Sequence, residues 1–288
     1  MNLALILEYQ VNQTDHQQSL GDFLKSQSLS KKALIALKHQ GGEIRVNHHI
    51  RTTRHGLKRG DVVQIKFPPE RVSEMLMPIK MSLKIVYEDD FLLIIDKVAG
   101  LPVMPTGSHD VSLANGILAY YNDIGLSSTV HFINRLDRGT SGLLIVAKYR
   151  HIHHLMTLSG EITRQYYAQV SGRLQGSGLI DAPIFRPDVT TIKRIIDPRG
   201  QKARTHYEEV KAFLNNTLVK CQLETGRTHQ IRIHLAHLGH PILKDPIYGM
   251  GAVDDCQLLH SYYLSFIHPV SGAFLKFETD LPQRFYQN

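Results

Sequence analysis

The chain has 288 residues, of which 42% are hydrophobic and 20% charged, a composition typical of a globular protein with one large domain or two unequal ones. Its two cysteines, Cys221 and Cys256, are too few for a disulfide framework or a cysteine-based zinc cluster, so we expect a reducing, cytoplasmic location. The apolar run at residues 3–7 is too short for a signal-peptide core or a membrane span, and we therefore expect no membrane association.

The net charge of +7 is concentrated near the N-terminus. Residues 18–71 contain eleven Lys or Arg and four Asp or Glu, an excess that equals the net charge of the whole chain. The other residues are balanced, with 22 basic and 22 acidic side chains. A concentrated basic field suits a polyanion such as nucleic acid, although a solvated basic face is the simpler alternative.

Residues 1–72 show the pattern of a small separate module. A strand and a loop are expected at the polar start, followed by two helices whose first turns Ser19 and Ser30 can cap. Gly41-Gly42 ends the second helix, and strands are predicted over 43–47 and 61–67.

The prolines that follow this module indicate a linker, which we place at residues 73–80, before a larger domain at 81–288. In that domain the apolar run at 143–147 is long enough for a buried strand and too short for a typical helix. The other expected elements are, in chain order, a hairpin at 84–97, a helix at 112–121, a helix at 151–158, a strand at 164–172, a long polar hairpin arm at 183–207, and a strand ending near 225 before a helix that stops at Gly239.

Asp137 is the strongest candidate for a reactive side chain. It precedes the Gly139–Gly142 turn that leads into the buried strand, with Arg135 and Arg138 on either side. Nearby cations favour the ionised carboxylate, and a fixed, ionised carboxylate is a usable nucleophile. A surface salt-bridge cluster is the alternative interpretation of this stretch alone.

The R-L-D triplet at 135–137 resembles the signature of RluA-type pseudouridine synthases, and three later segments repeat that resemblance in the right order. Residues 164–172 are similar to the family's basic-x-Tyr-x-Ala-x-Val-x-Gly motif, and residues 200–205 to its Gly-Lys-x-Ala-x-Thr motif with one residue inserted. The T-G-R-T-H-Q-I-R run at 225–232 matches at all eight positions. The resemblance covers nearly the whole chain.

This resemblance implies an α+β fold with a mixed, largely antiparallel sheet flanked by helices and crossed by the active-site cleft. It also implies an isomerase that converts uridine in RNA to its C-glycoside isomer without a cofactor. The catalytic residues would be Asp137, Tyr166 and Arg232, and the route of Asp137 stays open among sugar attack, base attack and sugar deprotonation. The supporting or base-flipping residues would be Arg135, Arg227 and His229.

The N-terminal module resembles the alpha-L RNA-binding motif, through segments that include Ser30-Lys31-Lys32, Arg45-Val46-Asn47 and 57–61. RNA is therefore the expected partner, ribosomal RNA of the large subunit ahead of transfer RNA, and we expect the enzyme to be a monomer. The expected phosphate contacts are Lys31, Lys32, Lys38, Arg45, Arg51, Arg54 and, on the hairpin arm, Lys193 and Arg194.

Other functional classes have less support. The histidines at 229, 234, 237 and 240 lack the i, i+4 pair with an adjacent glutamate that zinc hydrolases use, so we expect no metal. No Gly-x-Ser-x-Gly elbow or glycine-rich phosphate loop is present. The main alternative is a catalytically silent RNA-binding protein of the same fold, because Asn134 stands where the family usually has histidine. Since Arg135, Asp137, Tyr166 and Arg232 are all present, we expect Asn134 to modulate activity.

Overall fold

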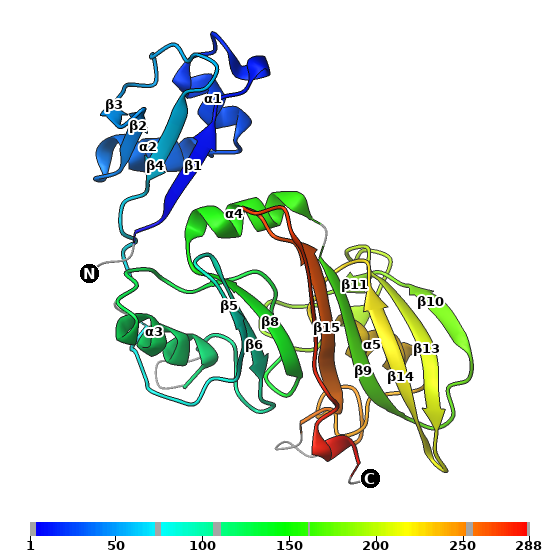
Figure 1. Cartoon of the computed structure of the whole chain (residues 1–288). Coiled ribbons are helices and arrows are strands. Elements are labelled where there is room, and N and C mark those ends of the chain that lie inside the picture. The colour runs from blue at the N-terminus through cyan, green and yellow to red at the C-terminus, as the bar shows by residue number, and fades with distance from the viewer. Residues whose placement is uncertain (1–3, 73–75, 106–110, 161, 252–255, 287–288) are drawn as a thin grey trace.

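The computed structural model describes residues 4–72, 76–105, 111–160, 162–251 and 256–286. Within these ranges the chain forms a four-stranded sheet near the N-terminus, a ten-stranded sheet and a small two-stranded sheet. Figure 1 shows the first of these, drawn from blue to cyan, standing apart from the ten-stranded sheet. None of the described helices has the length and apolar character needed to cross a membrane.

The N-terminal sheet has the order β1-β4-β2-β3, with every pair antiparallel. Ser19 and Ser30 cap the two helices as expected, since each side-chain oxygen accepts a hydrogen bond from the backbone N–H three residues on. The elements are β1 (Ile6–Gln10), the 3-10 turn η1 (Gln13–Asp15), α1 (Leu20–Ser26), α2 (Lys31–His39), β2 (Glu43–Val46), β3 (His49–Ile50) and β4 (Val62–Lys66).

The large sheet runs in the order β10-β13-β14-β9-β15-β8-β6-β5, with β16 on β15 and β7 on β8. Among these described pairs, β15 and β8 are parallel and the others antiparallel, which confirms the predicted mixed, largely antiparallel sheet. The strands are β5 (Ile85–Glu88), β6 (Leu92–Lys97), β7 (His131–Phe132), β8 (Ser141–Ala147), β9 (Thr163–Ser171), β10 (Ser177–Asp181), β13 (Arg204–Ala212), β14 (Asn216–Leu223), β15 (Leu259–Ile267) and β16 (Phe274–Glu278).

Helices cover both faces of the sheet around β6 and β8. Alternate residues of these strands, including Leu144 and Val146, pack with side chains of α3 (Leu113–Asp123). The intervening residues, including Ile145, pack with side chains of α4 (Arg150–Ser159). A strand buried on both faces requires apolar side chains at consecutive positions, which explains the uninterrupted apolar run.

On the other half of the sheet, α5 (Gln230–His237) packs against the face of β9 and β14 that holds Tyr166 and Cys221. The same core cluster includes side chains of α3, so α3 and α5 lie on one face of the sheet. The short turn η2 (Gln283–Phe285) follows β16.

The polar arm predicted at 183–207 is shorter than expected. Its base is β11 (Ile184–Phe185) paired with β12 (Ile195–Ile196), and Ile184 bonds back to Gln201. Residues from Arg204 onward belong to β13, because their N–H and C=O groups complete the ladders to β10 and β14. We refer to residues 184–196 as the hairpin.

Contacts of the residues before 72 join the N-terminal module to α4. The Glu70 carboxylate bonds His131 Nε2 at 2.6 Å and accepts from the backbone N–H of Arg150, at the positive end of the helix. Phe67 stacks on His151 of α4, with ring centroids 4.9 Å apart. The domain boundaries near 72 and 81 stay a prediction, and part of the proposed linker lies outside the described residues.

We expect His151→Leu to stabilise the protein, with the larger gain at acid pH. Neither ring nitrogen of His151 has a hydrogen-bond partner among the described residues, and burial lowers the pKa of His151 to about 4. An apolar replacement should therefore raise the free energy of unfolding by roughly 1 kcal/mol near pH 7.5. Below pH 6.5 the unfolded chain binds a proton that the folded chain does not, so wild-type stability falls toward pH 4 by roughly 1.4 kcal/mol per pH unit from this group alone.

Urea unfolding at several pH values measures this effect, with His39→Leu on the exposed end of α2 as the control. An equally steep acid decline in wild type and His151→Leu would contradict the interpretation.

Candidate active site

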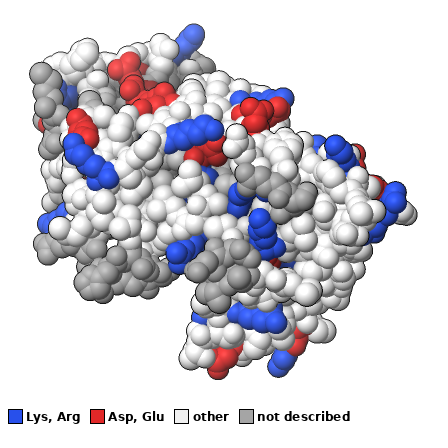
Figure 2. Space-filling model, turned by 90° about the horizontal axis from the view of Figure 1, so that it is seen from below, with Lys and Arg blue, Asp and Glu red and all other residues white. Residues whose placement is uncertain are grey.

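A cleft of about 750 Å³ opens on the face of the sheet that carries α3 and α5. Its volume lies within the range of small-ligand sites. Asp137 is the one carboxylate among its described lining residues, so the cleft is strongly cationic and suits a phosphate-bearing ligand. Figure 2 shows Lys and Arg side chains spread over the centre of the face seen from below, with few Asp or Glu side chains among them. The lining arginines are Arg135, Arg138, Arg164, Arg194, Arg227 and Arg232.

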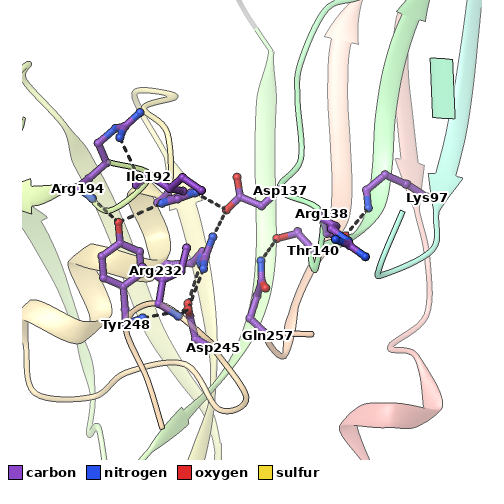
Figure 3. A network of polar contacts seen from close by, with 12 residues as sticks. Lys97, Asp137, Arg138, Thr140, Ile192, Arg194, Arg232, Asp245, Tyr248 and Gln257 are labelled. Carbon is purple, nitrogen blue, oxygen red and sulfur yellow. Dashed lines mark hydrogen bonds and ion pairs between the residues drawn. The ribbon is translucent and has the colours of Figure 1, made fainter. Parts of the chain in front are cut away.

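Three charged side chains, Asp137, Arg232 and Asp245, bond one to the next beside this cleft (Figure 3). Arg232 on α5 donates from Nη1 to Oδ2 of Asp137 at 2.8 Å. Its other edge donates to Asp245, from Nε at 2.7 Å and from Nη2 at 2.8 Å. The Asp245 side chain is fully buried and that of Arg232 is 4% exposed, whereas that of Asp137 is 27% exposed. Asp245 thus holds the arginine, and the arginine presents one N–H to the accessible carboxylate.

Electrostatics keep Arg232 and Asp245 charged. Burial alone disfavours both of these ions, but the Arg232 guanidinium outweighs the effect of burial on Asp245 and lowers the pKa of that carboxyl. The hydrogen bonds and charges of Asp245 and Asp137 in turn raise the pKa of Arg232 despite its burial. Arg232 contacts Oδ2 of Asp137, and no described residue bonds Oδ1. One oxygen of Asp137 is therefore held, and the other is available to a ligand.

The turn that carries Asp137 is fixed from both sides. Asn134 Oδ1 accepts from the backbone N–H of Ile145 at 2.8 Å, which ties the turn to β8. Lys97, at the end of β6, donates from Nζ to the carbonyls of Val98, Leu101 and Arg138. Burial lowers the pKa of Lys97 to about 7. The role of Asn134 explains how asparagine serves at this position, since its amide oxygen anchors the turn that carries Asp137.

Gly142 allows the two halves of the sheet to meet just after this turn. Its φ is +110°, and an added Cβ would lie 2.2 Å from the carbonyl oxygen of Ser261 on β15. Only glycine fits this conformation and this close approach.

The T-G-R-T-H-Q-I-R run forms a tight turn and the first turns of α5. Gln230 closes the turn, because its Oε1 accepts from Thr225 Oγ1 and from the backbone N–H of Arg227, each at 2.9 Å. His229 precedes the helix with a φ of +59°, a conformation that non-glycine residues seldom adopt and that occurs at functional sites. The turn directs Arg232 inward and leaves Arg227 exposed, bonded to the Lys202 carbonyl.

Tyr166 lines the cleft and is almost fully buried, and this burial raises its pKa. Its neighbour Tyr167 is not among the described lining residues and stacks on Tyr262, with ring centroids 4.0 Å apart. The prediction that only one of the two tyrosines faces the cleft is confirmed.

The structure brings most of the predicted site residues together but not all of them. The cleft contains Asp137, Tyr166, Arg232, Arg135, Arg227, His229 and Arg194. Lys193 is exposed on the hairpin and does not line it. The N-terminal basic residues lie on their own module, where Lys31, Lys32, Lys38, Arg51 and Arg54 are exposed, while Arg45 pairs with Glu43 at 2.7 Å.

The arginines that flank Asp137 in the sequence do not hold it. Arg138 donates from Nε to the carbonyl of Gly100, and Arg135 is exposed. The bonded cation is Arg232, one of the residues that the family resemblance named together with Asp137. Arg135 and Arg138 line the cleft without bonding Asp137, whereas α5, on the other half of the sheet, brings the Arg232 guanidinium to the carboxylate.

Three residues of the cleft region were not assigned from the sequence. Arg164 lines the cleft, Asp245 anchors Arg232, and the Tyr248 hydroxyl bonds His229. Asp245 and Tyr248 belong to the segment Asp-Pro-Ile-Tyr-Gly at 245–249, which also continues the resemblance to the family and is the one signal for them in the sequence.

Among the described residues, no group of three or more His, Cys, Asp or Glu side chains is placed to hold a metal ion. Two of the histidines considered above make structural contacts instead. His234 bonds Thr205 Oγ1 and the Ala182 carbonyl, and His240 bonds the Ser171 carbonyl.

Comparison with known proteins gives the family. Residues 91–237 match the family described as RNA pseudouridylate synthase. The chain is 43% identical over 262 residues to an uncharacterized RNA pseudouridine synthase, YjbO, of Bacillus subtilis (strain 168), covering 88% of this chain and 92% of that one. It is 39% identical over 218 residues to ribosomal large subunit pseudouridine synthase D of Nitrosomonas europaea, covering 70% of this chain and 63% of that one.

The fold is similar to a solved structure titled Human RNA Pseudouridylate Synthase Domain Containing 4. The TM-score is 0.57 at 22% identity, over 70% of this chain and 90% of that chain. With the match of residues 91–237 and the relative at 43% identity, the conclusion is that this chain belongs to the RluA-type RNA pseudouridine synthases, which are isomerases that act on RNA.

Proposed function

We propose that this pseudouridine synthase modifies uridines of large-subunit ribosomal RNA and uses Asp137 as its catalytic carboxylate. The observation that carries the proposal is the Asp137–Arg232 pair, in which an accessible carboxylate in an arginine-lined cleft is held through one oxygen. The choice of RNA is supported by the name of the relative from Nitrosomonas europaea, ribosomal large subunit pseudouridine synthase D.

The reaction is an isomerisation that needs no oxidant or reductant. The bond between N1 of the uracil and C1′ of the ribose breaks, a bond between C5 and C1′ forms, and the proton leaves C5 while N1 gains one. Asp137 acts through attack on the sugar, attack on the base or deprotonation of the sugar. The oxygen available for this step is Oδ1, to which no described residue donates a hydrogen bond.

The other cleft residues bind and orient the substrate. A target uridine within structured RNA must be flipped into the cleft, at a cost of a few kcal/mol. Tyr166 stacks on the base, and Arg135, exposed beside the catalytic turn, fills the space that the base leaves. Arg227 and Arg194 are placed to contact flanking phosphates.

The N-terminal module adds affinity without reading the sequence. Its exposed cations Lys31, Lys32, Lys38, Arg51 and Arg54 are available for phosphate contacts, whereas Arg45 must first exchange its bond to Glu43. Affinity that rests on such contacts falls steeply as salt rises.

Incubation with unmodified RNA tests the substrate. Purified protein is given large-subunit ribosomal RNA and transfer RNA, each transcribed in vitro, and pseudouridine is mapped at single-nucleotide resolution. We expect new pseudouridine at one or a few positions of the ribosomal RNA. Modification confined to transfer RNA would contradict the choice of substrate, and modification of neither RNA, with binding intact, would favour the catalytically silent alternative.

A further inference from the structure

Tyr248 contacts three residues of the active-site region from one position (Figure 3). Its hydroxyl oxygen lies 2.8 Å from the backbone nitrogen of Arg194 and 3.0 Å from Nδ1 of His229. Its ring makes an edge contact with the His229 imidazole and lies 5.3 Å from Cζ of Arg232. Tyr248 therefore connects the hairpin with two residues next to Asp137.

The hydrogen bonds around this hydroxyl favour one tautomer of His229. The backbone N–H of Arg194 can only donate, so the Tyr248 oxygen accepts there. The Tyr248 proton then has one acceptor among the described residues, Nδ1 of His229, and using it requires an Nδ1 that carries no hydrogen. Burial lowers the pKa of His229, so the ring is neutral near pH 7, and with Nδ1 as the acceptor its single proton is on Nε2.

That N–H lies beside the catalytic carboxylate. Nε2 of His229 is 3.9 Å from Oδ2 of Asp137, the oxygen that also accepts from Arg232. The distance is beyond a hydrogen bond, and a closing movement of about 1 Å would bring it to normal length. Two donors directed at Oδ2 would leave Oδ1 to the substrate.

We infer that Tyr248 is a positioning residue that holds His229 in the Nε2–H tautomer, so that the imidazole directs a donor at Oδ2 of Asp137. The opposite tautomer would turn a lone pair toward the carboxylate and repel it. Through Arg194 the same hydroxyl links this donor to the hairpin, which is proposed to contact RNA. The inference rests on the proposed catalytic role of Asp137.

The tautomer is measured by nitrogen NMR on the full chain labelled with ¹⁵N-histidine, with His229 assigned from its absence in His229→Gln. Wild type should show a neutral Nε2–H ring, and Tyr248→Phe should show a mixture of both tautomers. Tyr286→Phe, at an exposed position, is the matched control. An Nδ1–H ring in wild type, or an unchanged tautomer in Tyr248→Phe, would overturn the inference. The readout does not require activity, so it stands apart from the role of Asp137.

Steady-state kinetics test whether the positioning of His229 by Tyr248 affects catalysis. We expect Tyr248→Phe to lower kcat about 10- to 100-fold, as for other groups that orient a functional side chain, with KM for RNA nearly unchanged. In His229→Gln the amide nitrogen supplies the donor in place of Nε2–H, and this donor does not depend on the Tyr248 hydroxyl. Adding Tyr248→Phe to His229→Gln should therefore have no further effect on kcat. The same loss in both backgrounds would mean that Tyr248 acts through packing or through the hairpin, and the inference would be wrong.

Discussion

Asp137→Asn is expected to lower pseudouridine formation by at least about 10,000-fold, the scale seen when the central reactive group of an enzyme is removed. Asparagine has nearly the same shape but no ionised oxygen, so it cannot act as nucleophile or base. The fold should persist, because the side chain lies in an accessible turn and Arg232 keeps its paired bonds to Asp245.

Single-turnover assays with pseudouridine mapping, together with RNA binding and thermal unfolding, check this result. Asp123→Asn is the control, an exposed aspartate that pairs with Lys80 on the surface. Activity of Asp137→Asn within tenfold of wild type would contradict the assignment of Asp137 as the catalytic carboxylate. Loss of RNA binding in parallel with activity would point instead to a structural role.

Asp245→Asn is expected to reduce both stability and activity. The fully buried carboxylate accepts two bonds from Arg232 and the backbone N–H groups of Ile247 and Tyr248. Removing its charge leaves a buried guanidinium with Asp137 as its one anionic partner, and breaking a buried pair in this way costs about 3–5 kcal/mol. Arg232 should also turn its paired edge toward Asp137, which would occupy both carboxylate oxygens and suppress catalysis.

Denaturant unfolding and initial rates of pseudouridine formation measure the two effects. Asp181→Asn provides the comparison, since its bond to Arg204 is half exposed and its loss should leave the midpoint nearly unchanged. If Asp245→Asn unfolds at the wild-type denaturant concentration, the buried pair does not stabilise the fold as argued.

Local sequence patterns predicted those helices and strands that form because of interactions between residues close in the sequence. The serine caps of α1 and α2 and the apolar run of β8 were identified because capping and two-sided burial leave their mark within a few residues. β15 was not recognised as a strand, although it lies between β9 and β8. Its sequence includes buried polar side chains such as His260, which bonds Ser141 and Thr279 across the sheet, and such partners cannot be read from the strand itself.

Several residues of the site were predictable from the sequence, but the contacts between them were not. The resemblance supplied Asp137, Tyr166 and Arg232, and the structure brings all three into one cleft. The bond from Arg232 to Asp137 spans 95 residues, and the sheet register that creates it is not encoded by local spacing. Asp245 was missed for that reason: its segment continues the family pattern, but a separation of 13 residues does not mark this aspartate as the partner of Arg232.

The place of β15 in the sheet has a consequence for the order in which the working enzyme is made. Asp137 comes from the half of the sheet with β6 and β8, and Arg232 from the half with β9 and β14, while β15 lies between β8 and β9. On the ribosome, residues 259–267 emerge after both halves. The basic N-terminal module is therefore synthesised first and the Asp137–Arg232 pair is completed nearly last, so a nascent chain presents the module that we propose to bind RNA before it has the site that we propose to modify it.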